Sequence, residues 1–157
     1  MSKSICIKNI VEEDLVNYKL PSMFIGFPKC SFKCGRDVCQ NYRLEASKGI
    51  EVDIEEIIRL YLSNPITEAI VCGGLEPFDT FDDLMSLCQE FRKVSNDPIV
   101  IYTGFTENEI EKQVLMLTRL KPLVIKFGRY LPGKTASYNS ILGVNLASDN
   151  QYAKEWL

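Results

Sequence analysis

Residues 69–74, Ala69-Ile70-Val71-Cys72-Gly73-Gly74, decide the fold class of this chain. A short apolar run that stops at glycine is typical of a buried strand. Apolar residues at helical spacing on both sides predict one helix before this strand and another after it. The first helix opens at Asp53, ends at Asn64-Pro65 and has the apolar face Ile54, Ile57, Ile58 and Tyr61; the second opens at Thr80 and has the apolar face Phe81, Leu84, Cys88 and Phe91.

The alternation of strand and helix continues in both directions along the chain. Further buried strands are predicted over residues 23–28, 98–103 and 122–127, and a third helix follows the capping pair Thr106 and Glu109. This alternation favours a mostly parallel sheet with crossover helices. The length allows about four or five such units, against eight in a closed barrel. We therefore predict a single α/β domain over residues 1–157, with an open sheet or partial barrel whose ligands bind at the carboxyl ends of the strands.

The composition is that of an ordinary globular protein, with 46% apolar and 25% charged residues. The absence of histidine excludes Ser-His-Asp and Cys-His catalysis and histidine-ligated zinc. A net charge of −3 lacks the basic footprint of a nucleic-acid-binding protein. The amino terminus lacks the apolar core of a signal peptide, and no apolar run is long enough to span a membrane. We therefore expect a cytoplasmic protein with reduced cysteines that binds neither nucleic acid nor membranes.

Three of the six cysteines, Cys30, Cys34 and Cys39, form a C-x3-C-x4-C pattern. They lie in a loop predicted over residues 28–41. Closely spaced thiolates select zinc or an iron–sulfur cluster. Three ligands fit a [4Fe-4S] cluster in which one iron stays open to another ligand. They also fit a structural zinc site whose fourth ligand is one of the remaining cysteines, Cys6, Cys72 or Cys88. Of these, Cys72 and Cys88 are expected in the core, and Cys6 receives no role.

With this loop and the segments after it, the chain resembles the radical S-adenosylmethionine (SAM) proteins, and among them the activating proteins of anaerobic (class III) ribonucleoside-triphosphate reductase. The resemblance rests on segments that follow in the family's order: the cysteine loop with Asn41, Gly73-Gly74-Leu75-Glu76-Pro77, Tyr102-Thr103-Gly104-Phe105, Gly128-Arg129-Tyr130 and Ser148-Asp149-Asn150-Gln151. The chain departs from the family at four points: the last cysteine spacing is x4 instead of x2, Val38 replaces an aromatic residue, Leu75 is inserted in the glycine loop, and Phe127 stands where the family has an acidic residue.

The resemblance implies an open partial (β/α) barrel of the radical SAM type, with a [4Fe-4S] cluster and SAM as cofactors. Cys30, Cys34 and Cys39 would ligate the cluster, and the methionine part of SAM would chelate the fourth iron. Contacts to SAM would come from the glycine loop over residues 73–77 and from other segments at the same edge of the sheet, namely from Gly73, Gly74, Glu76, Thr103, Lys126 and, near the adenine, Val38.

The resemblance also implies an activity and partners. The reduced cluster would cleave SAM, and the resulting 5′-deoxyadenosyl radical would take a hydrogen atom from a glycine of the large reductase subunit. The partners would be that glycyl-radical subunit and a low-potential electron donor such as flavodoxin or ferredoxin. The tail over residues 143–157 is a candidate segment for docking the partner.

Other interpretations stay open at this point. The partner could instead be another glycyl-radical enzyme, of the pyruvate formate-lyase type, or the chain could be a non-enzymatic interaction module that holds zinc or an iron–sulfur cluster. Gly73-Gly74 and Thr103 also suit ordinary strand ends. Glu76 also suits a solvated loop, and Lys126 suits a surface lysine whose stem lies along apolar neighbours.

Overall fold

The computed structural model describes residues 3–28 and 49–157. The predicted cluster ligands Cys30, Cys34 and Cys39 lie outside the described residues, as does Val38. A methyl group added at Gly49 would lie 3.8 Å from Pro28 Cβ, so the chain enters and leaves the cysteine-containing segment at neighbouring points.

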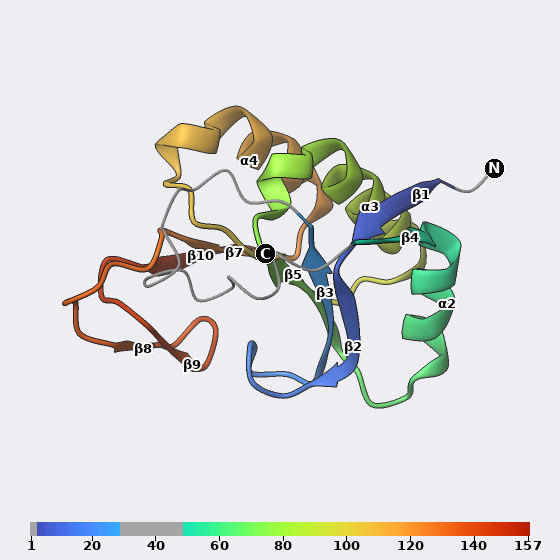
Figure 1. Cartoon of the computed structure of the whole chain (residues 1–157). Helices are drawn as coiled ribbons and strands as arrows, with labels where there is room; N and C mark the ends of the chain where they lie inside the picture. Colours follow the sequence, from blue (N-terminus) through green and yellow to red (C-terminus); the bar gives the residue numbers. More distant parts are fainter. Residues whose placement is uncertain (1–2, 29–48) are drawn as a thin grey trace.

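A six-stranded sheet forms the centre of the fold (Figure 1). Its strand order is β10 (Tyr152–Trp156), β7 (Leu123–Phe127), β6 (Ile99–Tyr102), β5 (Ala69–Gly74), β3 (Ser22–Phe27) and β2 (Asn9–Asp14). The four inner strands are parallel and correspond to the four strands predicted from the sequence. The two edge strands are antiparallel to their neighbours and were not predicted. The sheet is therefore mixed, and the curvature of a partial barrel stays a prediction.

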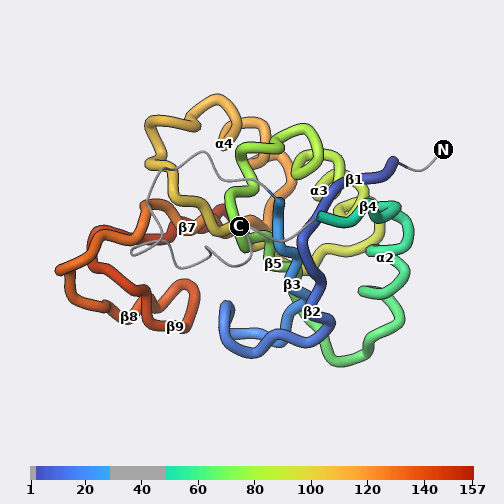
Figure 2. Tube along the Cα trace, viewed as in Figure 1, coloured from blue at the N-terminus to red at the C-terminus, as the bar shows by residue number. Residues whose placement is uncertain are grey.

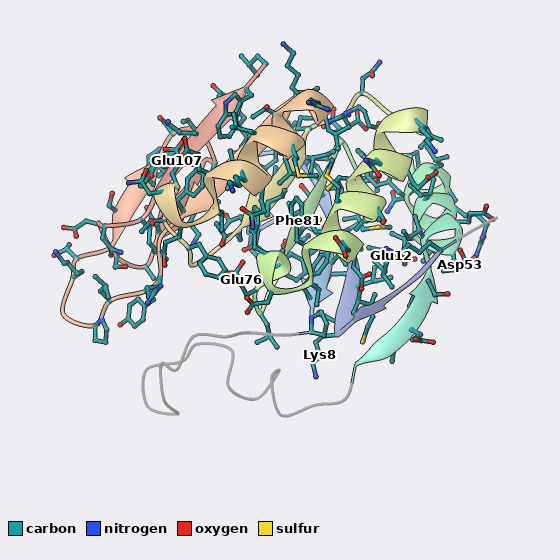
Figure 3. All side chains as sticks on the ribbon, turned by 90° about the horizontal axis from the view of Figure 1, so that it is seen from above. Lys8, Glu12, Asp53, Glu76, Phe81 and Glu107 are labelled. Atoms are coloured by element: carbon teal, nitrogen blue, oxygen red, sulfur yellow. The ribbon has the colours of Figure 1, made fainter. Side chains whose placement is uncertain are left out.

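Within the described residues, three α-helices pack against one face of this sheet, as Figures 1 and 3 show: α2 (Ile54–Ser63), α3 (Phe81–Val94) and α4 (Glu111–Leu117). Short 3-10 turns precede α3 and flank α4, namely η1 (Pro77–Thr80), η2 (Asn108–Ile110) and η3 (Thr118–Leu120). None of these helices is long and apolar enough to cross a membrane.

The predicted helix starts are largely confirmed. The Asp53 carboxylate accepts a hydrogen bond from the backbone N–H of Glu55 at 3.1 Å, and the Glu109 carboxylate accepts one from the backbone N–H of Thr106 at 2.8 Å. Thr80 occupies the N-cap position of α3, but its hydroxyl makes no capping hydrogen bond. The predicted start of this helix at Thr80 was therefore right in position, but η1 runs directly into α3 and precedes its first turn, and the Thr80 side chain does not cap it.

Side chains of the inner strands alternate between two apolar layers. In β5, Ile70 and Cys72 lie in the layer that faces the helices, whereas Ala69 and Val71 lie in the opposite layer. Burial on both faces explains why the inner strands read as nearly continuous apolar runs. Cys88 of α3 lies in the helix-side layer, and the exposed fractions of Cys72 and Cys88 are 0% and 1%. The prediction that both cysteines are core residues is confirmed.

The face turned away from the three helices is covered by loops and a small hairpin, which Figure 2 traces at the red end of the chain. The hairpin pairs β8 (Ser137–Asn139) with β9 (Val144–Leu146) and contributes Leu142 and Leu146 to the second apolar layer. A separate two-stranded sheet pairs β1 (Ser4–Ile7) with β4 (Ile50–Asp53) and adds Ile5 and Ile7 to the helix-side layer.

Arg92, in the last turn of α3, binds the segments that precede β6 and β7 at the amino-terminal edge of the sheet. Its guanidinium donates hydrogen bonds of 2.8 to 3.0 Å to four backbone carbonyls, those of Ser95, Asp97, Leu120 and Pro122. These carbonyls belong to the connections that lead into β6 and β7. One half-buried cation therefore links the starts of both strands.

Candidate functional site

The carboxyl ends of the parallel strands bring the predicted site residues together. Gly26 of β3 pairs with Gly73 of β5, and Tyr102 of β6 pairs with Lys126 of β7. Thr103 directly follows β6, and its backbone N–H donates to the carbonyl of Lys126 at 2.9 Å. The cysteine-containing segment begins after Pro28, at the same edge. Five of the predicted contact residues, namely Gly73, Gly74, Glu76, Thr103 and Lys126, therefore lie along one edge of the sheet.

The glycine pair at the end of β5 has a packing role of its own. Gly74 has a φ of +84°, and a methyl group there would lie only 2.8 Å from Gly26 Cα. A methyl group at Gly73 would lie 3.1 Å from the ring of Phe24. Gly74 therefore needs glycine because β3 and β5 approach closely there, whatever the pair binds, whereas a side chain at Gly73 would require the Phe24 ring to shift. Gly73 is buried and Gly74 is half-buried, so Gly74 is the more accessible to a ligand.

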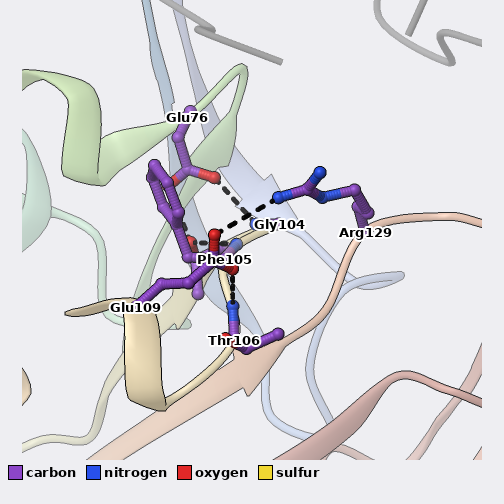
Figure 4. A network of polar contacts seen from close by, with 7 residues as sticks. Glu76, Gly104, Phe105, Thr106, Glu109 and Arg129 are labelled. Carbon is purple, nitrogen blue, oxygen red and sulfur yellow. Dashed lines mark hydrogen bonds and ion pairs between the residues drawn. The ribbon is translucent and has the colours of Figure 1, made fainter. Parts of the chain in front are cut away.

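The Glu76 carboxylate braces the loop after β5 against the end of β6 (Figure 4). One carboxylate oxygen, Oε1, accepts from the backbone N–H of Gly104 at 2.7 Å. The other, Oε2, accepts from the Thr103 hydroxyl at 2.8 Å and from the backbone N–H of Phe78 at 3.1 Å. The exposed fraction of Glu76 is 1%, so its interpretation as a solvated loop residue was wrong.

Burial raises the pKa of Glu76 from 4.5 to about 7, although its three hydrogen bonds act in the opposite direction. The Thr103 hydroxyl also bonds within the chain, since it donates to Glu76 and accepts from the backbone N–H of Phe105 at 3.0 Å. These contacts give Glu76 and Thr103 a role in holding the edge together. Direct contact of either side chain with a cofactor stays a prediction.

Lys126 is a buried cation at this edge. Its Nζ donates to the carbonyl of Gly128 at 2.9 Å and lies 5.7 Å from the centre of the Tyr102 ring. Only 7% of the residue is exposed, so the interpretation as a surface lysine was wrong. Burial lowers the pKa of Lys126 from 10.5 to about 8, while the nearby Glu76 carboxylate acts to raise it. The Lys126 ammonium group therefore loses its charge near pH 8, whereas an ordinary lysine loses it near pH 10.5.

Two further side chains belong to this edge, and sequence reasoning gave neither of them a role. Gln151 Nε2 donates to the carbonyl of Gly128 at 3.1 Å, the same carbonyl that Lys126 binds. Asn9 lies over Gly26, and its Oδ1 is a buried atom without a hydrogen-bond partner among the described residues. A shared tail motif pointed to the segment that contains Gln151 but not to this contact. No signal in the sequence pointed to Asn9.

The described cysteines do not form a metal site by themselves. Within residues 3–28 and 49–157, no group of three or more His, Cys, Asp or Glu side chains is placed to hold a metal ion. Cys72 and Cys88 are sealed in the helix-side layer, which leaves Cys6 as the more accessible of the three cysteines considered as a fourth zinc ligand. Its sulfur lies beside Gly49, since a methyl group there would be 2.6 Å from Cys6 Sγ.

Comparison with known proteins bears on the cysteine-containing segment. The model of one protein family, described as a 4Fe-4S single cluster domain, matches residues 22–140. The matched range starts at β3, includes all three predicted cluster ligands and ends after β7. No curated protein matches the chain.

Proposed function

The chain belongs to the 4Fe-4S single cluster domain family and is thus an iron–sulfur protein; from this premise we propose that it is a radical SAM activating enzyme, which generates a glycyl radical on anaerobic ribonucleoside-triphosphate reductase. One observation carries the proposal. The cysteine-containing segment leaves the sheet at the edge where the glycine pair, the buried Glu76 and the buried Lys126 meet. A cluster held there would face the groups that an amino-acid cofactor needs.

The proposed ligands of the cluster are Cys30, Cys34 and Cys39. Three protein thiolates leave one iron of a [4Fe-4S] cluster open, and SAM can chelate that iron through its amino and carboxylate groups. When bound together, the reduced cluster and SAM supply the one-electron cleavage that gives methionine and a 5′-deoxyadenosyl radical. No histidine or nucleophilic serine is required for this chemistry, in agreement with a chain that contains no histidine.

The residues at the edge suit the methionine part of SAM. The Lys126 ammonium is buried and hydrogen-bonded to one carbonyl among the described residues, so it can pair with a carboxylate. The Asn9 Oδ1, unpartnered among the described residues, is an acceptor over Gly26, the residue of β3 that pairs with Gly73, and an amino group could donate to it there. Glu76 would keep the glycine loop and the end of β6 in place. Val38 would lie near the adenine, as the resemblance implies.

The proposed partners are a large glycyl-radical subunit and a low-potential electron donor such as flavodoxin or ferredoxin. The described helices all cover one face of the sheet, and loops cover the other. A protein that encloses a small substrate commonly surrounds it with its own chain. An edge that its own helices do not enclose suits a substrate that is part of another protein, and the tail over residues 143–157 would lie beside it.

Anaerobic reconstitution tests the cluster. With iron and sulfide, the wild-type protein should turn brown and bind about four irons, and Cys34→Ala should lose most of them. The matched control is Cys88→Ala, which removes a core thiol and should keep its iron. A colourless protein that binds zinc tetrahedrally and ignores SAM would establish the interaction module instead.

The activity is tested in two further steps. Reduction of the reconstituted protein with dithionite in the presence of SAM should release 5′-deoxyadenosine, and Cys34→Ala should release none. Electron paramagnetic resonance then identifies the partner: a glycyl-radical doublet should form on anaerobic ribonucleotide reductase. A doublet that forms only on pyruvate formate-lyase would assign the chain to the other class of activating enzyme.

A further inference from the structure

We propose that Gln151 is a positioning residue, which fixes the Lys126 ammonium so that it receives the carboxylate of the bound amino-acid cofactor. The identity of that cofactor as SAM rests on the proposed function. The contact of Gln151 with the Gly128 carbonyl, which also binds Lys126, does not depend on the identity of the cofactor.

One backbone carbonyl joins the two side chains. Gly128 O accepts a hydrogen bond from Lys126 Nζ at 2.9 Å and another from Gln151 Nε2 at 3.1 Å. A carbonyl oxygen has two lone pairs, and these two donors occupy both of them. Gly128 has a φ of +99°, in the left-handed region, and it directly follows β7. The direction of its carbonyl therefore depends on a turn that few other residues adopt.

The amide of Gln151 has a defined orientation. Its Oε1 accepts from the backbone N–H of Ser148 at 3.2 Å, and the backbone N–H of Gln151 donates back to the Ser148 carbonyl at 3.1 Å. Because Oε1 faces an N–H donor, the NH₂ group of the same amide must face Gly128 O. Ser148 is itself fully buried and accepts from the backbone N–H of Leu131 at 3.3 Å. The turn over residues 148–151 thus directs the side-chain N–H of Gln151 toward the carbonyl of Gly128.

This arrangement gives Lys126 a fixed location and leaves it able to bind a ligand. Gly128 O is the hydrogen-bond acceptor of Lys126 Nζ among the described residues, and the ammonium can donate three hydrogen bonds. If Gln151 were absent, the Gly128 carbonyl would be free to rotate toward solvent and the ammonium would follow it. Gln151 would therefore act on the ligand through Lys126, without touching the ligand itself.

Gln151 lies beyond residues 22–140, the range that the family model matches. The tail adds β10 to the sheet, antiparallel to β7, so that Tyr152 pairs with Phe127 and Ala153 pairs with Lys126. This pairing brings a residue from the end of the chain to the carboxyl edge. The tail therefore contributes to the environment of Lys126.

The test uses the anaerobically reconstituted protein and compares Gln151→Ala with Asn150→Ala. Asn150 is a matched control because it lies in the same turn and its Nδ2 donates to the next carbonyl, that of Arg129, at 2.9 Å. Equilibrium binding is measured with SAM and with decarboxylated SAM, which lacks the carboxylate. We expect Gln151→Ala to weaken SAM binding about fivefold, the usual effect of one lost hydrogen bond, and Asn150→Ala to stay within about twofold of wild type. Neither variant should weaken the binding of decarboxylated SAM by more than about twofold.

Each other outcome has a definite meaning. If Gln151→Ala and Asn150→Ala weaken SAM binding equally, or if Gln151→Ala weakens both ligands equally, the residue only supports the turn and the proposal is wrong. Wild-type protein that carries the cluster but binds no SAM would overturn the proposed function instead. A second measurement does not need a ligand: Lys126 is labelled by reductive ¹³C-methylation, and its NMR signal should change in Gln151→Ala but not in Asn150→Ala. An unchanged signal in both variants would also refute the positioning role.

Discussion

Replacement of Glu76 by glutamine should change how the stability of the protein depends on pH. Glu76 is buried at the carboxyl edge and accepts hydrogen bonds from Thr103, Gly104 and Phe78. Its pKa is about 7 in the folded protein, against an ordinary value of 4.5. The folded state therefore binds the proton more tightly than the unfolded state does. The contribution of Glu76 to stability is therefore fully present below pH 4.5 and is lost as the pH rises through about 7.

The size of this loss follows from the two pKa values. One pKa unit corresponds to about 1.4 kcal/mol, so the contribution of Glu76 to the unfolding free energy should be about 3 kcal/mol smaller at pH 8 than at pH 4.5. Glutamine has the shape of the protonated acid and does not titrate. Glu76→Gln should therefore gain about 3 kcal/mol relative to wild type over the same interval.

Urea unfolding followed by far-UV circular dichroism measures the difference at half-unit steps of pH. The iron-free protein, kept reduced, serves for the full range, and the reconstituted protein serves above pH 6, where about 1 kcal/mol of the difference remains. The control is Glu90→Gln, in which an exposed partner of Lys93 is neutralised and little effect is expected. Parallel stability curves for wild type and Glu76→Gln across this range would refute the titration of Glu76 near pH 7.

Three further predictions concern the edges of the sheet. Arg92→Met should lower the unfolding free energy by about 3 kcal/mol in urea titrations, because four carbonyls lose a charged donor, whereas the exposed Arg119→Met should have little effect. In the same assay, Gly74→Ala should lower the unfolding free energy by about 2 kcal/mol more than Gly133→Ala. Both glycines have a φ of +84°, but an added methyl group meets Gly26 Cα at residue 74 and nothing within 4 Å at residue 133. Equal losses of unfolding free energy would contradict the close approach of β3 and β5. The affinity for SAM, measured by equilibrium binding, should fall as the pH rises above about 8, because the Lys126 ammonium then loses its charge. Lys126→Met should bind SAM weakly and independently of pH over this range. If the affinity of the wild-type protein does not change up to pH 10, Lys126 is excluded as the carboxylate partner.

The inner part of the fold could be predicted from the sequence because its physical signals are local. The strand over residues 69–74 is buried on both faces, so its side chains are apolar without interruption and its end is marked by glycine. Asp53 caps α2 through the next turn of the chain, which is a contact between near neighbours. Signals of this kind do not depend on how distant segments meet.

The edge strands could not be predicted for the opposite reason. Three consecutive residues of β2, Val11, Glu12 and Glu13, are exposed, so the segment does not alternate between apolar and polar positions, and its pairing with β3 is irregular between Val11 and Asp14. The β10 segment is short, mixes charged and aromatic residues, and becomes a strand only because β7 lies beside it. In both cases tertiary pairing decides the structure, and the local sequence carries little of it.

The sequence predicted that the candidate residues meet at the carboxyl edge of the sheet, but it did not predict their contacts. The rule that ligands bind at the carboxyl ends of parallel strands identified Gly73, Thr103 and Lys126 from the sequence. The sequence could not tell that Glu76 accepts three hydrogen bonds from the chain itself, since two of its donors are 27 and 28 residues away. The contact of Gln151 with Gly128, across 23 residues, depends likewise on the pairing of β10 with β7.

The two buried charges of the edge, Glu76 and Lys126, make their hydrogen bonds to the chain and form no ion pair with each other among the described residues. The absence of this ion pair affects which ligands the edge can bind. If Lys126 were paired with Glu76, an incoming carboxylate would have to displace a buried partner of equal charge, at a cost of several kcal/mol. Because Glu76 is satisfied by Thr103, Gly104 and Phe78, the charge of Lys126 remains available. A carboxylate ligand would therefore add a partner to a buried ammonium group without exposing a buried acid, and the edge would keep its shape when the ligand binds.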